Sequence, residues 1–273
     1  MIKTRKKVPR VKSDTPVPPP EPTPERDPEP AQQAAAWFVH FYTAIGLIFA
    51  AWIAVLLVRG GAEAFRWSCL LMVAASLVDA TDGTLARRFR VKLVLPEFDG
   101  RKLDDLIDFL TYTCLPLLLI WRAQLYPEGY EPWLLLPLLA SAYGFCQVDA
   151  KTDDGYFLGF PSLWNVVALY LYVLQLPAWV TFTVVSTLAV LTFVPTRYLY
   201  PSLPGRLNAI SNMIGTPWVI LLVIILWRLP TNAPLVPGEP TWWLGVASLY
   251  FPAFYMIASW VVSFRLRRDR VAA

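Results

Sequence analysis

Long apolar windows recur along this 273-residue chain and constrain its fold more than any other feature. A helix needs about 20 mostly apolar residues to cross a bilayer. The composition agrees, because 56% of the residues are hydrophobic and only 16% are charged. Backbone polar groups in lipid must pair within their own segment, so the sequence predicts an all-α, polytopic membrane helix bundle. Its eight predicted transmembrane helices cover residues 36–58, 65–78, 106–125, 133–148, 162–176, 179–194, 213–229 and 242–264.

The chain ends differ in composition from this core and are predicted to be separate regions. Residues 1–35 begin with a basic run and continue into a proline-dense acidic stretch. This region has few large apolar side chains, and their burial could not offset the conformational entropy lost on ordering. We therefore expect a disordered tail. Residues 36–264 are predicted to form one transmembrane domain, the part of the chain that would hold any active site, and residues 265–273 to form a short basic tail.

Basic residues in the predicted loops set the orientation. With eight spans, both termini lie on one side of the membrane. Only four of the 24 Lys and Arg residues then fall on the other side: Arg59, Arg66, Arg122 and Arg228. Cytoplasmic loops carry the excess of Lys and Arg. The termini and the loop after residue 78 are therefore predicted to be cytoplasmic.

Acidic residues flank this loop at helical spacing. Asp79 and Asp82 share one helix face, and Asp104 and Asp108 share another, whereas Asp105 is out of phase and is expected to point away. Each such charge would cost roughly 3 kcal/mol at the bilayer centre, which favours a functional role. A simpler interpretation pairs solvated carboxylates with nearby basic side chains. Two facing acidic helices could instead hold one or two divalent ions, with Mg²⁺ or Mn²⁺ favoured by oxygen ligands.

These residues also carry a family resemblance. The pattern Asp79-x2-Asp82-Gly83-x2-Ala86-Arg87, followed by Gly100-x3-Asp104-x3-Asp108, resembles the signature of the CDP-alcohol phosphotransferases. Members of that family are integral membrane enzymes that move a substituted phosphoryl group from a CDP-linked donor to an alcohol. The interval between Arg87 and Gly100 is longer than the family's usual one.

A narrower resemblance covers about residues 36–264. The segments His40–Ala44, Pro96–Gly100, Leu103–Tyr112 and Ala150–Asn165 are similar to the bacterial phosphatidylcholine synthase branch, which has the longer interval and eight spans. The resemblance implies transfer from CDP-diacylglycerol to choline in the bacterial inner membrane, giving phosphatidylcholine and CMP. It also admits a homodimer, and it implies contact with membrane lipids and none with nucleic acid.

The resemblance further assigns roles to individual residues. It implies that two divalent ions, Mn²⁺ or Mg²⁺, bind Asp79, Asp82, Asp104 and Asp108. It makes Asp108 the general base that takes the proton of the choline hydroxyl. Nucleotide and donor binding falls to Asp79, Gly83, Ala86, Arg87 and Gly100, and the two glycines would let phosphate or nucleotide approach the backbone closely.

Choline adds a demand that the motif does not meet. A quaternary ammonium has no N–H to donate, so it is recognised by aromatic faces and diffuse negative charge. Each aromatic residue in such a chain can equally be a packing residue. The candidates near the cytoplasmic end are Tyr112, Tyr143, Asp149, Asp153, Tyr156 and Trp164.

Two other functions remain open from the residues. A sibling enzyme could use serine, inositol phosphate or glycerol phosphate, and a phosphorylated acceptor would need a basic pocket that Arg197 and Arg206 could supply. A choline or cation transporter could also combine acidic and aromatic groups. Transporters often have repeated halves with broken helices at the membrane midplane, whereas this chain shows no internal repeat.

Overall fold

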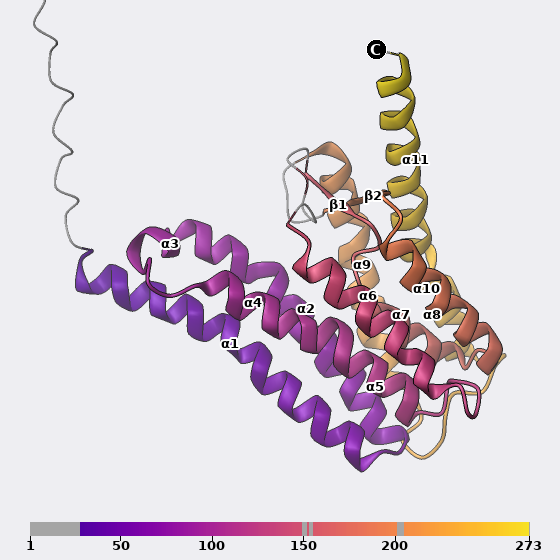
Figure 1. The fold of residues 1–273 in the computed structure, drawn as a ribbon. Helices are drawn as coiled ribbons and strands as arrows, with labels where there is room; N and C mark the ends of the chain where they lie inside the picture. Colours follow the sequence, from indigo (N-terminus) through magenta and orange to yellow (C-terminus); the bar gives the residue numbers. More distant parts are fainter. Residues whose placement is uncertain (1–27, 149–151, 153–154, 201–204, 273) are drawn as a thin grey trace, which may run out of the picture.

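A computed structural model describes residues 28–148, 152, 155–200 and 205–272, and these are mostly helical. Figure 1 shows the order of the elements. The first half contains α1 (Pro30–Arg59), α2 (Ala62–Arg88), α3 (Val91–Val94), α4 (Gly100–Asp108), the π-helix η1 (Phe109–Cys114) and α5 (Leu115–Arg122). The second contains the 3₁₀-helix η2 (Glu131–Leu134), α6 (Leu135–Cys146), β1 (Tyr156–Leu158), α7 (Trp164–Leu174), α8 (Ala178–Thr192), β2 (Arg197–Leu199), α9 (Arg206–Arg228), α10 (Pro240–Ser248) and α11 (Tyr250–Ala272).

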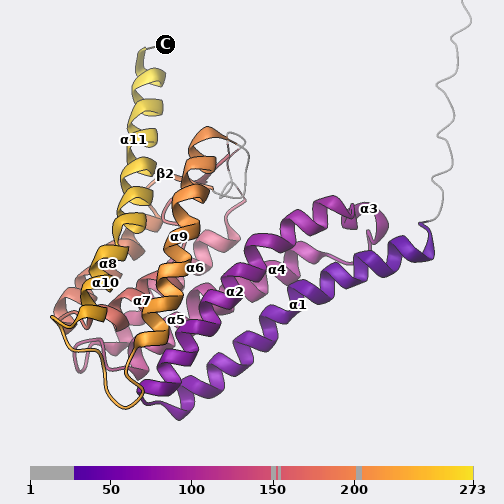
Figure 2. The same ribbon diagram turned by 180° about the vertical axis from the view of Figure 1, so that it is seen from behind.

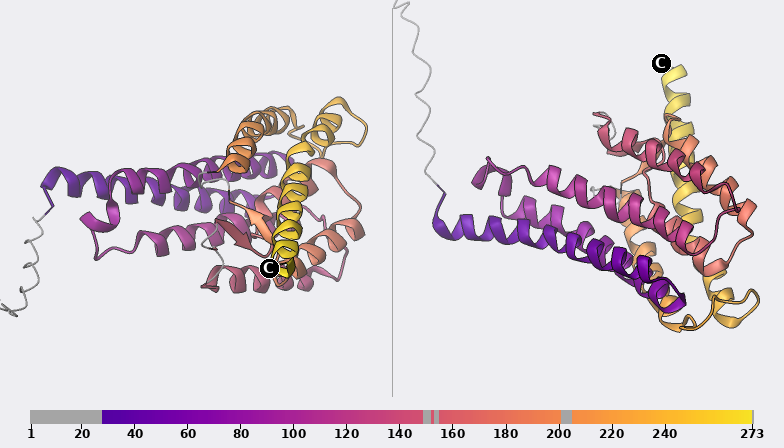
Figure 3. Two further views of the ribbon diagram at one scale, coloured as in Figure 1. Left: turned by 90° about the horizontal axis from the view of Figure 1, so that it is seen from above. Right: turned by 60° about the horizontal axis from the view of Figure 1, so that its bottom comes forward.

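The helices form two groups that diverge toward one end of the molecule. In Figures 1 and 2, α1, α2 and the run from α4 to α5 lie side by side, and α6 to α11 form the other group. The two views of Figure 3 show the same division. Helix α3 and the strands β1 and β2 lie at the diverging end, whereas α5 packs against α7 near the other end.

The length of the helices supports a membrane-embedded chain. Four stretches are long and apolar enough to cross a bilayer, namely Pro30–Arg59, Ala62–Arg88, Arg206–Arg228 and Pro240–Leu266. The other predicted windows lie on shorter helical segments, including Trp164–Leu174 and Ala178–Thr192. Many large apolar side chains, such as Phe38, Phe41 and Trp52, point outward, as expected for a surface that faces lipid. The protein is therefore an integral membrane protein.

Helix α1 begins earlier than the sequence predicted. Glu29 is the N-cap residue, and its backbone N–H donates to Gln32 Oε1 at 3.2 Å in a capping box, with Pro30 at the first helical position. These signals start the helix before the apolar window does. Residues 30–35, which the sequence placed in the predicted tail, are therefore helical. Residues 1–27 of that tail lie outside the described part of the chain.

The C-terminal boundary also differs. Helix α11 runs from Tyr250 to Ala272, so it continues through most of the predicted tail at residues 265–273. Five of the nine residues after 264 are charged, but the nine include no proline and only good or moderate helix formers. The helix therefore continues beyond the apolar stretch.

A two-stranded antiparallel sheet departs from the all-α prediction. Strand β1 pairs with β2 in a register that places Phe157 opposite Tyr198. Helix α11 binds the other edge of β2: Ser263 Oγ accepts from Arg197 N at 2.6 Å, and Ser259 Oγ accepts from Leu199 N at 3.1 Å. Strands of three residues show no alternation over a useful length, and here serine hydroxyls complete their backbone pairing.

A π-helical turn interrupts the long helix that follows the acidic motif. Segments α4, η1 and α5 are continuous, and Leu115 N donates to Leu110 O across the π turn. Pro116 explains its position, because proline has no N–H and its ring clashes with the carbonyl four residues earlier. The wider turn also changes the direction in which the residues of η1 point.

Candidate active site

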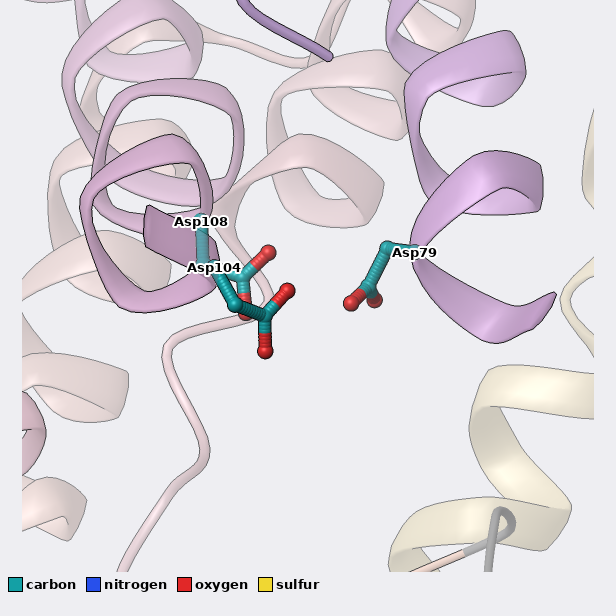
Figure 4. A group of neighbouring side chains, drawn as sticks. All are labelled: Asp79, Asp104 and Asp108. Carbon is teal, nitrogen blue, oxygen red and sulfur yellow. The ribbon is translucent and has the colours of Figure 1, made fainter. Parts of the chain in front are cut away.

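Three carboxylates of the acidic motif converge between α2 and α4. Asp79 projects from α2 toward Asp104 and Asp108 on α4, as Figure 4 shows. One oxygen from each lies within 4.8 Å of the others, and all three side chains are half-buried. Asp105 is outside this group, as its phase on the helix predicts.

The fourth acid, Asp82, lines the same space from α2. A cavity of ≈ 10 Å³ lies between the helices and is bordered by Asp79, Asp82, Asp104 and Asp108. Asp82 itself is only 6% exposed, and Thr43 Oγ1 on α1 donates to its Oδ2 at 2.8 Å. Burial of a carboxylate costs less when it accepts hydrogen bonds, so Thr43 holds Asp82 beside the other three acids.

This arrangement suits a hard divalent cation. Mg²⁺ binds oxygen ligands at about 2.1 Å, so the oxygens around one ion lie about 3–4 Å apart. The spread of at most 4.8 Å among the three carboxylate oxygens is close to that value. An all-oxygen donor set favours Mg²⁺ or Mn²⁺ over zinc. The residues therefore fit the predicted metal.

Two glycines set the distance between α1 and α4. A β-carbon at Gly100 would lie 2.5 Å from His40 Cε1, and one at Gly46 would lie 2.6 Å from Ile107 Cγ2. Each glycine thus admits a side chain from the facing helix. Because His40 lies against Gly100, this glycine accommodates a protein side chain on the face that it turns toward α1.

The other motif glycine presents an open face. A β-carbon at Gly83 would meet only Arg87 Nη1, at 3.4 Å. Arg87 is exposed, and its Nη2 donates to Thr84 Oγ1 at 3.1 Å. Ala86 is partly exposed on the same helix. This end of α2 can therefore receive a phosphate or a nucleotide.

Comparison with known proteins identifies the family. The family model described as CDP-alcohol phosphatidyltransferase matches residues 38–150. The phosphatidylcholine synthase of Pseudomonas aeruginosa is 39% identical over 224 residues, covering 81% of this chain and 91% of that protein. This chain belongs to the CDP-alcohol phosphatidyltransferase family. The phosphatidylcholine synthase of Borreliella burgdorferi is 31% identical over 85% of this chain and 96% of that protein. The phosphatidylcholine synthase of Rhizobium johnstonii is 32% identical over 82% of this chain and 94% of that protein.

The choline candidates of this phosphatidyltransferase lie in different environments. Tyr112 in η1 donates its hydroxyl proton to Asp79 Oδ2 at 2.7 Å and is part of the carboxylate site. Tyr143 is 48% exposed on α6 and contacts the ring of Phe193. Tyr156 begins β1, and its N–H donates to Thr152 Oγ1.

The remaining candidates are Trp164, Asp149 and Asp153. Trp164 is 0% exposed, and its Nε1 donates to Ser141 Oγ at 2.7 Å, so its ring is enclosed by the core of the transferase. Asp149 and Asp153 lie outside the described residues.

Sequence reasoning missed several polar residues that support the acids. Thr43 binds Asp82, and Asn165 Nδ2 donates to Ser76 Oγ at 2.9 Å, less than one turn before Asp79 on α2. Thr43 lies in the segment His40–Ala44 and Asn165 closes the segment Ala150–Asn165, two stretches that carried the narrower resemblance. The resemblance therefore pointed to both segments, but it did not indicate which residues Thr43 and Asn165 would bind.

Proposed function

We propose that this phosphatidyltransferase condenses CDP-diacylglycerol with choline to give phosphatidylcholine and CMP. The observation that carries the proposal is the convergence of the motif carboxylates from α2 and α4. It occurs in a chain whose relatives over most of its length are phosphatidylcholine synthases.

In the proposed reaction Asp108 is the general base. The choline oxygen attacks the phosphorus that carries diacylglycerol, the bond from that phosphorus to the CMP oxygen breaks, and the choline proton passes to the Asp108 carboxylate. Asp79, Asp82, Asp104 and Asp108 would hold Mn²⁺ or Mg²⁺, with two ions proposed, which would neutralise negative charge on the pyrophosphate. Asp108 lies in the converging group, consistent with both roles.

Donor binding is proposed at the open end of α2. Gly83 and Ala86 would lie against the cytidine nucleotide, and the exposed guanidinium of Arg87 would pair with a phosphate. Asp79 would contact the donor through the metal. Gly100 is proposed to act indirectly, by letting His40 pack on α4 and so placing Asp104 and Asp108.

Choline is proposed to bind where the carboxylates meet the aromatic residues at the diverging end of the helix groups. Tyr143, whose side chain is 48% exposed, is the described candidate for an aromatic contact with choline, and Tyr112 faces the site with its hydroxyl. The negative charge of the acids favours a quaternary ammonium there, and an aromatic face would supply cation–π contact.

The eight-span arrangement and the orientation belong to the same proposal. Each predicted window lies on a helical segment, and the chain around α3, from Arg87 to Lys102, carries six Lys and Arg residues. We propose that this end, with the active site, faces the cytoplasm of a bacterial inner membrane. A homodimer is the proposed assembly.

A substrate screen tests the function. Purified protein in nanodiscs receives CDP-diacylglycerol, Mn²⁺ and one labelled alcohol at a time: choline, serine, inositol phosphate or glycerol phosphate. We expect label in phosphatidylcholine together with an equal amount of CMP, without a sealed vesicle. Transfer to another alcohol in place of choline would overturn the substrate, and choline uptake into vesicles without CMP release would indicate a transporter.

A further inference from the structure

We propose that Tyr112 is a positioning residue that fixes the carboxylate of Asp79 for metal binding. This inference deepens the proposed function and depends on its metal site. The hydroxyl of Tyr112 donates to Asp79 Oδ2 at 2.7 Å, and the two residues are 33 positions apart on different helices. A carboxylate has about four lone-pair sites and can accept this bond while it ligates an ion.

The π turn presents Tyr112 to α2. Residues Phe109–Cys114 form the wide turn directly after Asp108, with Leu115 N donating to Leu110 O. Such turns occur often at functional sites, because one additional residue per turn shifts the following side chains around the helix. Here the π turn lies between Asp108, a proposed metal ligand on α4, and Tyr112, which contacts Asp79 on the facing helix α2.

Additional hydrogen bonds hold Tyr112 and its neighbours in place. Ser76, on α2 just before Asp79, is a second hydrogen-bonding neighbour of the Tyr112 hydroxyl. Asn165 Nδ2 on α7 donates to Ser76 Oγ at 2.9 Å, and Asn165 is only 6% exposed. A chain of polar contacts therefore joins α7, α2 and η1 and ends at the Asp79 carboxylate.

Chemistry distinguishes this role from direct choline contact. A phenol that orients a ligating carboxylate acts through its hydroxyl, so its loss weakens metal binding, by about 10–100-fold for such supporting residues. A ring that contacts choline acts through its π face, which phenylalanine retains and leucine lacks. The two variants Tyr112→Phe and Tyr112→Leu therefore separate the two roles.

The experiment measures Mn²⁺ binding alone, by electron paramagnetic resonance of free Mn²⁺ titrated with purified protein in nanodiscs. We expect Tyr112→Phe and Tyr112→Leu to weaken Mn²⁺ binding to a similar extent, about 10–100-fold, with the choline KM unchanged. Tyr172→Phe is the matched control, because Tyr172 is a buried tyrosine whose hydroxyl donates to Ala62 O away from the acids. It should bind Mn²⁺ as the wild type does.

Two results would overturn the inference. One is wild-type Mn²⁺ affinity in Tyr112→Phe, and the other is a raised choline KM confined to Tyr112→Leu. A double variant protects against a folding artefact: in an Asp79→Asn background, Tyr112→Phe should add no further loss of Mn²⁺ binding, whereas general misfolding would add one. If the wild type binds Mn²⁺ but transfers nothing to choline, the proposed function fails while this inference stands.

Discussion

Polar groups serve different ends in two regions of this phosphatidyltransferase. Between α2 and α4, side-chain donors such as Thr43 and Tyr112 bind carboxylates that also face a cavity. In the segment 156–164 and β2, polar groups bind other parts of the protein: Trp164 binds Ser141, and the backbone of β2 binds serines of α11.

The contrast indicates where function and stability reside. Hydrogen bonds in the first region maintain charged groups in a partly open site, as expected for a binding centre. Those in the second complete the packing of buried groups. Substitutions in the first region should therefore reduce turnover more than stability, and substitutions in the second should do the reverse.

The largest effect is expected at Asp108. Asp108→Asn removes a base and a metal ligand, so we expect turnover to fall by at least about 10³-fold, measured as CMP release from CDP-diacylglycerol and choline. Asp105→Asn is the matched control on the same helix, because Asp105 lies outside the converging group. It should retain most of the activity. Equal losses of turnover in the two variants would contradict the inference that Asp108 faces the active site while Asp105 points away from it.

An intermediate effect is expected at the two motif glycines. Gly100→Ala places a methyl group against His40, so we expect a loss of about 1–3 kcal/mol in stability together with reduced turnover. Gly83→Ala meets only the flexible end of Arg87 and should retain its stability, since alanine favours helix, but bind the donor less well. The melting temperature should fall in Gly100→Ala, whereas the KM for CDP-diacylglycerol should rise in Gly83→Ala.

A double variant sharpens this test. If His40 is the cause, adding His40→Ala to Gly100→Ala should cost less than the sum of the two single changes. Strict additivity would contradict the proposed contact between α1 and α4 and would return Gly100 to the nucleotide site.

The smallest effect on turnover is expected in the second region. Trp164→Phe loses the hydrogen bond to Ser141, which should lower stability by about 1–3 kcal/mol because a buried hydroxyl loses its donor. The KM for choline should not change, since the ring is enclosed. A selective rise in that KM, at unchanged melting temperature, would place Trp164 in the choline site and break the contrast between the regions.

The acidic motif was predictable because helical spacing alone places residues on a face. Asp104 and Asp108 are one turn apart, so their shared direction and the exclusion of Asp105 follow from periodicity. The choline candidates had no such phase. Tyr112 binds a carboxylate and Trp164 is enclosed in the core, although both were selected for the same reason.

Supporting residues could not be paired from the sequence, because their partners are distant. Thr43 and Asp82 are 39 positions apart, and Asn165 and Ser76 are 89 apart. Such contacts depend on how α1, α2 and α7 pack, which local patterns do not encode. The short strand β2 was missed for the same reason, because serines of the distant helix α11 complete its backbone pairing.

The sequence by itself determined that this chain is a membrane helix protein, because apolar length and helical spacing are local properties. The residues of the acidic motif also carried the resemblance to the family. Tertiary structure decided which acids meet, what covers Gly100, and which tyrosine reaches Asp79. These follow from the depth at which α4 packs on α1 and from the π turn before Pro116. Packing depth and helix rotation arise from contacts between segments far apart in the chain, and no single segment contains them.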